Sequence, residues 1–489
     1  MKRAAVDLHK LRSDEVLATI KLACMTPKKS RCAANGGLDH EKSVFSIQQH
    51  KPLGACSHGL FVPPSAMNTA PSHGVGTNPQ ALSAFITASE SYSIVASQDI
   101  VDVRGLKLWA KGNPVSSALQ QRLLDRKLKQ PLEACLLAED GVTVFTLHHD
   151  LKTFLEQDTP LTLALRPWAS LLLAQVKQLP LHSVAQLLLT TALATRPTTL
   201  PHAVTAMALA GAIASGRFTG VDVRLAMLGG LLHDVGEVYI QPEYLDHGTA
   251  LDSVGHKHLV VHPRVAQMLL DATTDYPKAL CLAIGEHHER LDGSGYPARL
   301  SGQQVSPLGR LLAVVEVTMG LLRNPQAPLN RASFALRVVP GEFDPQWGGQ
   351  VSDMARAAGE VLPPAAAHSR AEQLLPMTLI DRRLHQTQEL AQTLKNQGRT
   401  GPFFEIMETA LLRLNRLRVA WNALGFWGLD ASQLSCQEAF ELQLAGAELQ
   451  QRLRALQREC MLLCERLGEL EKTLLEPLWH GLLDGRVKV

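Results

Sequence analysis

Residues 287–297 read HHERLDGSGYP, and residues 231–240 read LLHDVGEVYI. The first stretch joins two adjacent histidines to a glycine-rich turn. The second places His233 and Asp234 side by side at the end of an apolar run with helical spacing. Imidazole nitrogen and carboxylate oxygen are suitable ligands for Fe, Mn or Zn, and an adjacent His-Asp pair can serve two ions if the carboxylate bridges them. Together the two stretches predict a metal centre around a helical core.

Histidine is concentrated in the same part of the chain. Of the 19 histidines in 489 residues, eight lie between positions 200 and 290. These eight are His202, His233, His247, His256, His258, His262, His287 and His288. Several neutral rings buried in an apolar bundle without partners would cost free energy, and a shared metal centre removes that cost. The candidate ligands, from four segments of the chain, are His202, His233, Asp234, His262, His287 and His288.

The composition limits the class of protein. There are 48 Lys and Arg against 46 Asp and Glu, a formal net charge of +2, so nothing favours a nucleic-acid polymer as the main ligand. Aromatic residues make up only 5%, and the abundance of Leu, Ala and Gln favours helix over strand. The best candidate membrane span, 171–194, is interrupted by Lys177, Gln178, Pro180 and His182, and the N-terminus lacks a secretory signal. We therefore expect a mainly α, cytoplasmic protein without a membrane span.

Changes of sequence pattern divide the chain into four parts. The first is rich in Ser, Gly, Pro and Asn without periodicity, the second mixes strand and helix patterns, and the last two are helical. The expected parts are a flexible leader at 1–78, a small α+β module at 90–148, a helical domain at 150–345 and a C-terminal helical bundle or coiled coil at 365–489. The helical domain contains the candidate ligands.

Individual elements can be expected within these parts. In the α+β module, residues 94–108 have a strand pattern and residues 117–128 have a helical pattern. In the C-terminal region, the pair Gly401-Pro402 is a helix start signal and predicts an amphipathic helix over residues 405–424.

The last helical segment carries a heptad repeat. Leucines recur every seven residues, and a second set of mostly apolar residues lies four positions after each of them. The two sets are Leu442, Leu449, Leu456, Leu463 and Leu470, and Gly446, Leu453, Cys460, Leu467 and Leu474. This seam is expected to form one helix that ends at Pro477. It predicts a packing face, either on helices of the same chain or in a homodimeric coiled coil through residues 442–474.

The motifs HDVGE, VHP and HHERLDGSGYP, with Arg310 and the EFDP of residues 342–345, resemble those of HD-GYP phosphodiesterases, a branch of the HD-domain metal-dependent phosphohydrolases. The resemblance covers residues 187–345. It implies an all-helical domain that hydrolyses the bacterial second messenger cyclic di-GMP to linear pGpG or GMP. It also implies bound divalent ions, Fe or Mn, that polarise the phosphate and activate a water.

The resemblance also implies roles for individual residues. His233 and Asp234 would lie at the catalytic centre, with Asp234 bridging two ions. The implied metal ligands are His202, His233, Asp234, His262, His287, His288 and Glu316. The residues expected to contact the substrate are Arg290, Gly295, Tyr296, Pro297 and Arg310. Tyr296 and the loop around it could also contact a protein partner.

Three positions depart from the family pattern. The usual HDxGK ends here in Glu237, so an anion replaces a cation that would face the phosphate, which argues for weaker binding of a doubly anionic dinucleotide. Glu316 replaces a ligating Asp and is expected to remain a ligand with shifted geometry, the alternative being a solvated helix residue. Thr198 stands where members with three ions have Glu, which favours two ions.

Glu237 has a second possible role. It follows His233 by four residues, so a helix that continued through both would bring its carboxylate toward a metal. Gly236, however, is a residue that can end a helix, in which case the two side chains do not share a face.

Two functions follow from these observations. The first is a metal-dependent phosphodiesterase for cyclic di-GMP or another nucleotide, which the complete set of core histidines favours. The second is a module that keeps the metal site but has weak or no turnover and senses nucleotide or docks partners, which Glu237 and Glu316 favour.

Overall fold

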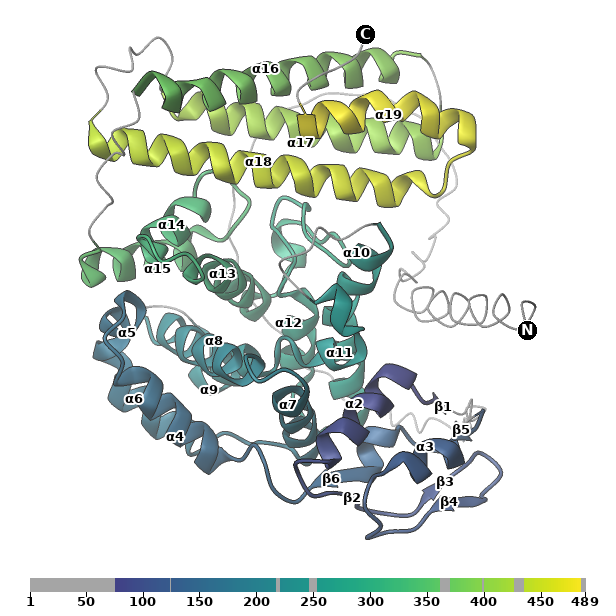
Figure 1. The fold of residues 1–489 in the computed structure, drawn as a ribbon. Helices are drawn as coiled ribbons and strands as arrows, with labels where there is room; N and C mark the ends of the chain where they lie inside the picture. The colour runs from purple at the N-terminus through teal and green to yellow at the C-terminus, as the bar shows by residue number, and fades with distance from the viewer. Residues whose placement is uncertain are drawn as a thin grey trace, which may run out of the picture. The chain divides into compact units, whose positions relative to one another are not determined.

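The structure is a computed structural model that describes residues 75–123, 125–216, 220–245, 253–360, 370–397, 400–425 and 435–484. The described part is mainly helical, so the predicted fold class is confirmed (Figure 1). The expected leader lies outside the described residues except for positions 75–78, and so does His247.

The first described part is a small α+β region. Its elements are β1 (Val75–Gly76), α2 (Pro79–Ser89), β2 (Ile94–Ala96), β3 (Ile100–Val101), β4 (Lys107–Trp109), α3 (Ser117–Leu123), β5 (Lys127–Leu128), η1 (Leu132–Cys135) and β6 (Leu136–Ala138). The strands form three antiparallel pairs, β1 with β5, β2 with β6 and β3 with β4. In the longest pair, Ile94 lies opposite Ala138 and Ala96 lies opposite Leu136.

Two sequence expectations for this region need correction. The strand pattern over 94–108 corresponds to three short strands rather than one, because turns separate them. The helix expected over 117–128 ends at Leu123. Asp125 has a φ of 58°, outside the helical region, and the chain then enters β5.

The helical domain follows. Its elements are α4 (Val144–Leu155), α5 (Pro160–Leu165), η2 (Arg166–Trp168), α6 (Ala169–Val176), α7 (Ser183–Thr195), α8 (Thr199–Ala214), α9 (Val223–Leu232), η3 (Val235–Tyr239), η4 (Pro242–Tyr244), α10 (Ser253–Leu259), α11 (His262–Thr273), α12 (Lys278–Glu286), η5 (Gly302–Gln304), α13 (Pro307–Leu322), α14 (Pro328–Ala335) and α15 (Pro345–Ala358). Buried apolar residues from Ala81 to Ala355 form one continuous core, which the α+β region and this domain share.

Helices α8 and α9 are largely buried in the core of this domain. Nearly every residue of α9 from Ala226 to Leu232 is buried, and so is most of α8. The two helices pack closely because α9 carries Gly230: a Cβ atom there would lie 2.6 Å from the carbonyl oxygen of Ala206. A backbone atom cannot move aside as a flexible side chain can. This close contact places the end of α9, and the residues after it, beside α8.

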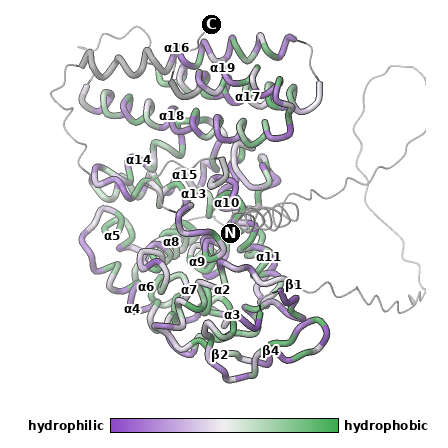
Figure 2. Tube along the Cα trace, turned by 45° about the vertical axis from the view of Figure 1, so that its right-hand side comes forward, coloured by the Kyte–Doolittle hydropathy of each residue, from purple (hydrophilic) through white to green (hydrophobic). Residues whose placement is uncertain are grey.

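The described residues of the C-terminal region form a bundle of four helices. They are α16 (Arg370–Lys395), α17 (Pro402–Ala423), α18 (Cys436–Cys464) and α19 (Glu469–Asp484). Helix α17 begins at Pro402 directly after Gly401, as the start signal predicted, and a capping box between Ser435 and Glu438 begins α18. Along α17 and α18 the trace alternates between hydrophilic and hydrophobic residues, as amphipathic helices require (Figure 2).

The heptad seam packs within its own chain. Leu442, Leu449, Leu453 and Leu456 are buried in one cluster with apolar residues of α14, α16 and α17. Residues 442–456 of the seam therefore pack on helices of the same chain, as the intrachain alternative predicted. A contiguous coiled coil over residues 442–474 is not present.

The expectation of one helix ending at Pro477 is wrong. Helix α18 ends at Cys464, residues 465–468 interrupt it, and Pro477 lies inside α19. The interruption changes the helical phase, so Leu470 is 71% exposed while Leu475 and Leu478 are buried instead. Among the described residues, no helix combines the length and the apolar character that a membrane crossing requires.

The close packing of α8 and α9 can be tested with Gly230→Ala. The added methyl group must push the helices apart, and overpacking of this kind costs about 1–3 kcal/mol. The apparent melting temperature of the main thermal transition should fall by several degrees. A matched control is Gly320→Ala, at an exposed position of α13 where a Cβ atom meets nothing within 4 Å. The control should leave stability unchanged or raise it slightly, since alanine favours helix. Equal melting temperatures for the two variants would contradict the close contact.

Candidate metal centre

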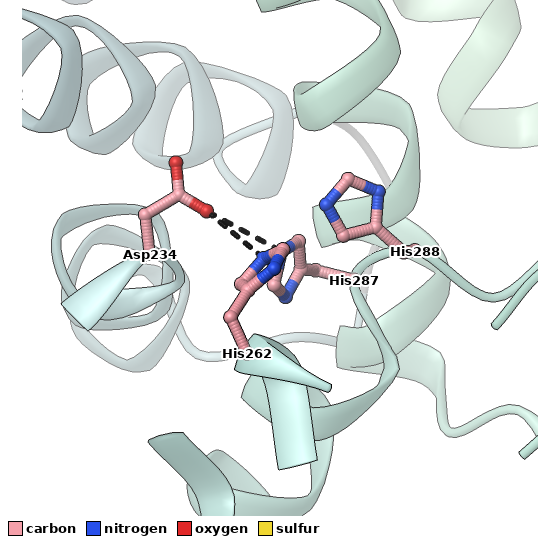
Figure 3. A group of neighbouring side chains, drawn as sticks. All are labelled: Asp234, His262, His287 and His288. Atoms are coloured by element: carbon pink, nitrogen blue, oxygen red, sulfur yellow. Dashed lines mark hydrogen bonds and ion pairs between the residues drawn. The ribbon is translucent and has the colours of Figure 1, made fainter. Parts of the chain in front are cut away.

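Five helices bring the candidate ligands together. His202 lies in the first turn of α8, while His233 and Asp234 directly follow α9. His262 is the first residue of α11, and Glu316 lies in α13. His287 and His288 directly follow α12. Figure 3 shows the Asp234 carboxylate facing His262 and His287, with His288 beside them.

The seven side chains form two groups that share Asp234. In each group the possible ligand atoms all lie within 4.8 Å of one another. The first group is His202, His233, Asp234 and Glu316, and the second is Asp234, His262, His287 and His288. The two oxygens of the shared carboxylate face different groups. Oδ2 lies 3.4 Å from His202 Nε2 and 3.1 Å from His233 Nε2, and Oδ1 lies 3.4 Å from His262 Nε2 and 3.5 Å from His287 Nε2.

Backbone contacts fix the tautomers of three of these histidines. The Nδ1 atoms of His233, His262 and His287 each donate to a carbonyl oxygen three residues earlier, at 2.8, 2.6 and 2.6 Å. A carbonyl can only accept, so Nδ1 carries the proton and Nε2 of the neutral ring presents a lone pair to the cluster. This is the usual arrangement of a metal-binding histidine.

The cluster without a cation is chemically unsatisfied. Nε2 of His262 lies only 3.2 Å from Nε2 of His287, so two lone pairs face each other. Nε2 of His202 and Nε2 of His233 are buried, and as long as these rings are neutral they have no hydrogen to donate to the carboxylate oxygens of Asp234 and Glu316 beside them. A proton or a metal ion between these nitrogens would remove the repulsion, and the mixed imidazole and carboxylate donors suit a first-row divalent ion. The residues present therefore fit such a metal.

The pKa directions agree with a site that attracts cations. Burial alone would lower the pKa of His233, but the Asp234 and Glu316 carboxylates raise it well above its usual value. Burial alone would raise the pKa of Asp234, yet His233 and hydrogen bonds from the surrounding imidazoles hold it well below its usual value. The pKa of Glu316 is also lowered, against the effect of burial, chiefly by the hydrogen bond to His233. The two carboxylates stay ionised and favour positive charge among the rings.

Glu237 lies beside this cluster but is not among its ligand groups. Helix α9 ends at Leu232, and Glu237 lies in η3, so the helical face that would have joined it to His233 does not continue. A close approach holds η3 in place, since a Cβ atom at Gly236 would lie 2.2 Å from the carbonyl oxygen of His262. The alternative that made Glu237 a metal ligand is therefore not supported.

The partner of Glu237 is an arginine that the motifs did not indicate. Arg196, which caps the end of α7, donates from Nη1 to Glu237 Oε2 at 2.6 Å, and both side chains are partly buried. Burial and the nearby Asp234 carboxylate raise the pKa of Glu237, while Arg196 acts in the opposite direction. The guanidinium thus balances the acidic side chain that replaces the family's lysine.

The residues expected to contact substrate occupy different positions. The Tyr296 ring stacks on His288 with the ring centres 4.4 Å apart, so it lies against the cluster. Arg290 lies 4.7 Å above the ring of Phe343, and burial lowers the pKa of its guanidinium. Gly295 is buried, and Pro297 is partly buried in the same loop.

Arg310 has a structural set of contacts. Its guanidinium donates to the carbonyl oxygens of Val305 and Gly302 and to Gln303, and it pairs with Asp344 at 3.5 Å. None of these interactions involves a member of the metal cluster.

Comparisons with known proteins agree with the motifs. Residues 188–336 match the HD domain family. Over 129 residues the chain is 35% identical to a cyclic di-GMP phosphodiesterase of Pseudomonas aeruginosa, covering 25% of this chain and 31% of that protein. It is 37% identical over 97 residues to a cyclic di-GMP phosphodiesterase of Vibrio cholerae, covering 19% and 20% of the two chains. It is also 30% identical over 87 residues to a 3'3'-cGAMP-specific phosphodiesterase of the same species, covering 18% and 19%.

These similarities cover only part of each chain. The chain matches less than a third of the length of each of these relatives. No solved structure matches the chain.

Glu316 and Glu237 form a matched pair for a test of the metal site. Both are partly buried acids next to the cluster, but only Glu316 belongs to a ligand group. Glu316→Gln should lower metal affinity by about tenfold or more, because it removes the charge and half of the oxygen donors. Glu237→Gln should leave metal content unchanged. Metal per chain, measured by inductively coupled plasma mass spectrometry after dialysis against a fixed Mn²⁺ concentration, checks both. Loss of metal only in Glu237→Gln would show that the ligand groups are wrongly assigned.

Proposed function

We propose that the chain is a metal-dependent phosphodiesterase of the HD-GYP type that hydrolyses a cyclic dinucleotide. The observation that supports this most strongly is the pair of ligand groups that share Asp234. Two groups with a common carboxylate are suited to two neighbouring divalent ions, Fe or Mn, on either side of that carboxylate. Such pairs of ions are typical of enzymes that hydrolyse phosphate esters.

Each part of the chain has a distinct task in this proposal. His202, His233 and Glu316 would hold one cation, and His262, His287 and His288 would hold the other. Bound divalent cations would neutralise charge on the phosphate and lower the pKa of a water. Asp234 fixes the spacing between the two positions. The carbonyl oxygens that accept from Nδ1 keep the imidazoles oriented, so the ligand geometry exists before substrate arrives.

The substrate is expected to lie along the surface formed by Tyr296 and the cluster. The aromatic ring stacked on His288 offers a flat apolar face to a base or sugar, while the cations attract the phosphates. The chain is similar both to cyclic di-GMP phosphodiesterases and to a 3'3'-cGAMP-specific phosphodiesterase, so the proposed substrate class is a cyclic dinucleotide, with cyclic di-GMP as the first to test.

The two substitutions that favoured an inactive sensor have a structural explanation. Glu316 belongs to a ligand group, so the longer side chain still reaches the cluster. Arg196 lies 2.6 Å from Glu237 and balances its charge, so the acidic side chain is not an isolated anion in the path of the substrate. These contacts favour the enzyme over the sensor.

Turnover provides the direct test of the proposed function. The purified full-length protein, incubated with Mn²⁺ or with Fe²⁺ under anaerobic conditions, should convert cyclic di-GMP to pGpG or GMP, followed by liquid chromatography. His233→Ala should reduce the rate by at least about 100-fold, because it removes a ligand of the metal that stabilises the transition state. His149→Ala, an exposed histidine of α4, serves as the matched control and should retain the wild-type rate.

Two outcomes would contradict the proposal. One is tight binding of cyclic di-GMP and 3'3'-cGAMP to the metal-loaded protein with no product from either. The other is hydrolysis that survives His233→Ala unchanged, since the activity would then come from a contaminant or another site.

The Arg196–Glu237 pair predicts a pattern across three variants. Arg196→Met leaves the Glu237 carboxylate unbalanced near Asp234, so KM for the anionic substrate should rise by roughly tenfold. Glu237→Gln should have little effect on KM. The double variant Arg196→Met/Glu237→Gln should recover most of the loss, because the residual charge is removed. Steady-state kinetics measures the pattern. A double variant as impaired as Arg196→Met would mean that Arg196 acts by itself and not by balancing Glu237.

A further inference from the structure

The loop that carries Tyr296 is packed tightly on the metal ligands. This signature loop comprises residues 290–301, between α12 and η5. The Tyr296 amide donates to the carbonyl oxygen of His288 at 3.1 Å. A Cβ atom at Gly295 would lie 2.4 Å from the His288 carbonyl oxygen and from the Arg290 nitrogen, so only glycine allows this approach. The position of the loop and the position of the ligand His288 are therefore linked through backbone contacts.

The other side of the loop is held by two arginines from the C-terminal bundle. Arg413 and Arg416 lie one turn apart on α17, and each donates from Nη1 to the carbonyl oxygen of Asp292 at 2.8 Å. The Asp292 carboxylate pairs with both guanidinium groups, at 3.2 and 3.0 Å. Arg413 also donates to the carbonyl oxygen of Gly293. Two arginines of α17 thus bind two consecutive loop residues, although Arg413 and Gly293 are 120 positions apart in the sequence.

Asp292 also shapes the loop from within. Its Oδ1 accepts from the amide and the hydroxyl of Ser294, at 2.8 and 2.5 Å, while Oδ2 faces the arginines. Burial alone would raise its pKa, but the Ser294 hydroxyl and the Arg413 guanidinium lower it, so the carboxylate stays ionised. One side chain therefore joins the internal turn of the loop to α17.

A second helix of the bundle supports the same loop. Glu459 of α18 pairs with Arg299 at 3.4 Å and with Arg413 at 3.7 Å. Arg452 of α18 pairs with Glu342 at 3.2 Å, and the carbonyl oxygen of Glu342 accepts from the amide of Leu291 at 2.9 Å. The loop is held at both of its ends by contacts that lead to α18.

Burial distinguishes these pairs from ordinary surface salt bridges. The side chain of Asp292 is 6% exposed and that of Arg413 is 11% exposed, whereas in an exposed pair such as Lys472 and Glu469 the values are 38% and 89%. Exposed ion pairs contribute little to stability. Removal of one partner from a buried pair leaves an unbalanced charge and disturbs the residues around it. Loss of an arginine should therefore change the loop and not only the local helix.

We propose that Arg413 and Arg416 are positioning residues of the phosphodiesterase site: through Asp292 they hold the signature loop so that Tyr296 lies against His288 and faces the substrate. The C-terminal bundle, which lies outside the residues that match the HD domain family, is then an integral part of the site. This inference rests on the proposed function for its effect on turnover. The effect on the loop itself does not depend on it.

The first experiment measures the loop directly. Hydrogen–deuterium exchange of the full-length, Mn²⁺-loaded protein should show faster exchange in peptides covering 288–302 in Arg413→Met and in Arg416→Met. Peptides from α8 should be unchanged. Arg418→Met removes the same charge from the same helix and is the matched control, because Arg418 lines a pocket with His385 and Glu389 of α16 and not with the loop. Arg416, which is 37% exposed, is the milder substitution if Arg413→Met fails to fold.

The second experiment measures turnover of cyclic di-GMP. Arg413→Met and Asp292→Asn should each lower kcat/KM by about 10- to 100-fold, because the loop would no longer hold Tyr296 in the position that binds substrate. Metal content per chain should be unchanged, because neither substitution removes a metal ligand. Arg413→Lys should retain part of the rate, since it keeps the charge but loses the forked geometry. The double variant Arg413→Met/Asp292→Asn should be no worse than the more impaired single variant, because both remove one interaction.

The outcomes separate this inference from the proposed function. Unchanged exchange over 288–302 in the arginine variants would overturn the inference, and so would losses of turnover that multiply in the double variant. Faster exchange in a protein that hydrolyses no cyclic dinucleotide would support the positioning of the loop while contradicting the proposed function.

Discussion

The carboxylate of Asp234 lies between four imidazoles, and the rest of the site is arranged around it. Its two oxygens face two separate sets of nitrogens, and three of the rings are oriented by backbone carbonyl groups that fix which nitrogen points inward. Such a cluster is stable only with positive charge inside it. The buried helices that deliver the ligands, closely packed at Gly230, make the geometry rigid enough to select cations in defined positions.

Acidic side chains around the cluster are paired with arginines. Arg196 balances Glu237 on one side of the ligands, and Arg413 with Arg416 balances Asp292 in the signature loop. Both acids are largely buried, and each of them alone would repel an anionic substrate or distort its neighbourhood. With their partners in place, neither acid would oppose the attraction between bound cations and phosphate in the proposed reaction. The near-neutral net charge of the chain, +2, is consistent with attraction that is local to the site.

The residues that surround Asp234 could be singled out from the sequence because they occur in short local motifs. His233 with Asp234 and His287 with His288 are adjacent pairs, and residue type alone indicates their chemistry. Arg196 and Arg413 were not predictable, since their acidic partners lie 41 and 121 residues away and nothing in the sequence near them indicates the pairing.

The C-terminal heptad seam shows a different limit of prediction from sequence. Its leucines indicated a packing face correctly, but the heptad spacing continues through residues 465–468, where the helix is interrupted. Periodicity describes which residues share a face and does not say where a helix turns back.

The central claim is that two cations occupy positions on either side of Asp234, and anomalous diffraction tests it most directly. Crystals of the Mn²⁺-loaded protein, measured at the manganese absorption edge, should show two peaks about 3.5–4 Å apart, the usual spacing of two-metal sites. One peak should lie among His202, His233 and Glu316, and the other among His262, His287 and His288. A single peak, or peaks away from Asp234, would contradict the account.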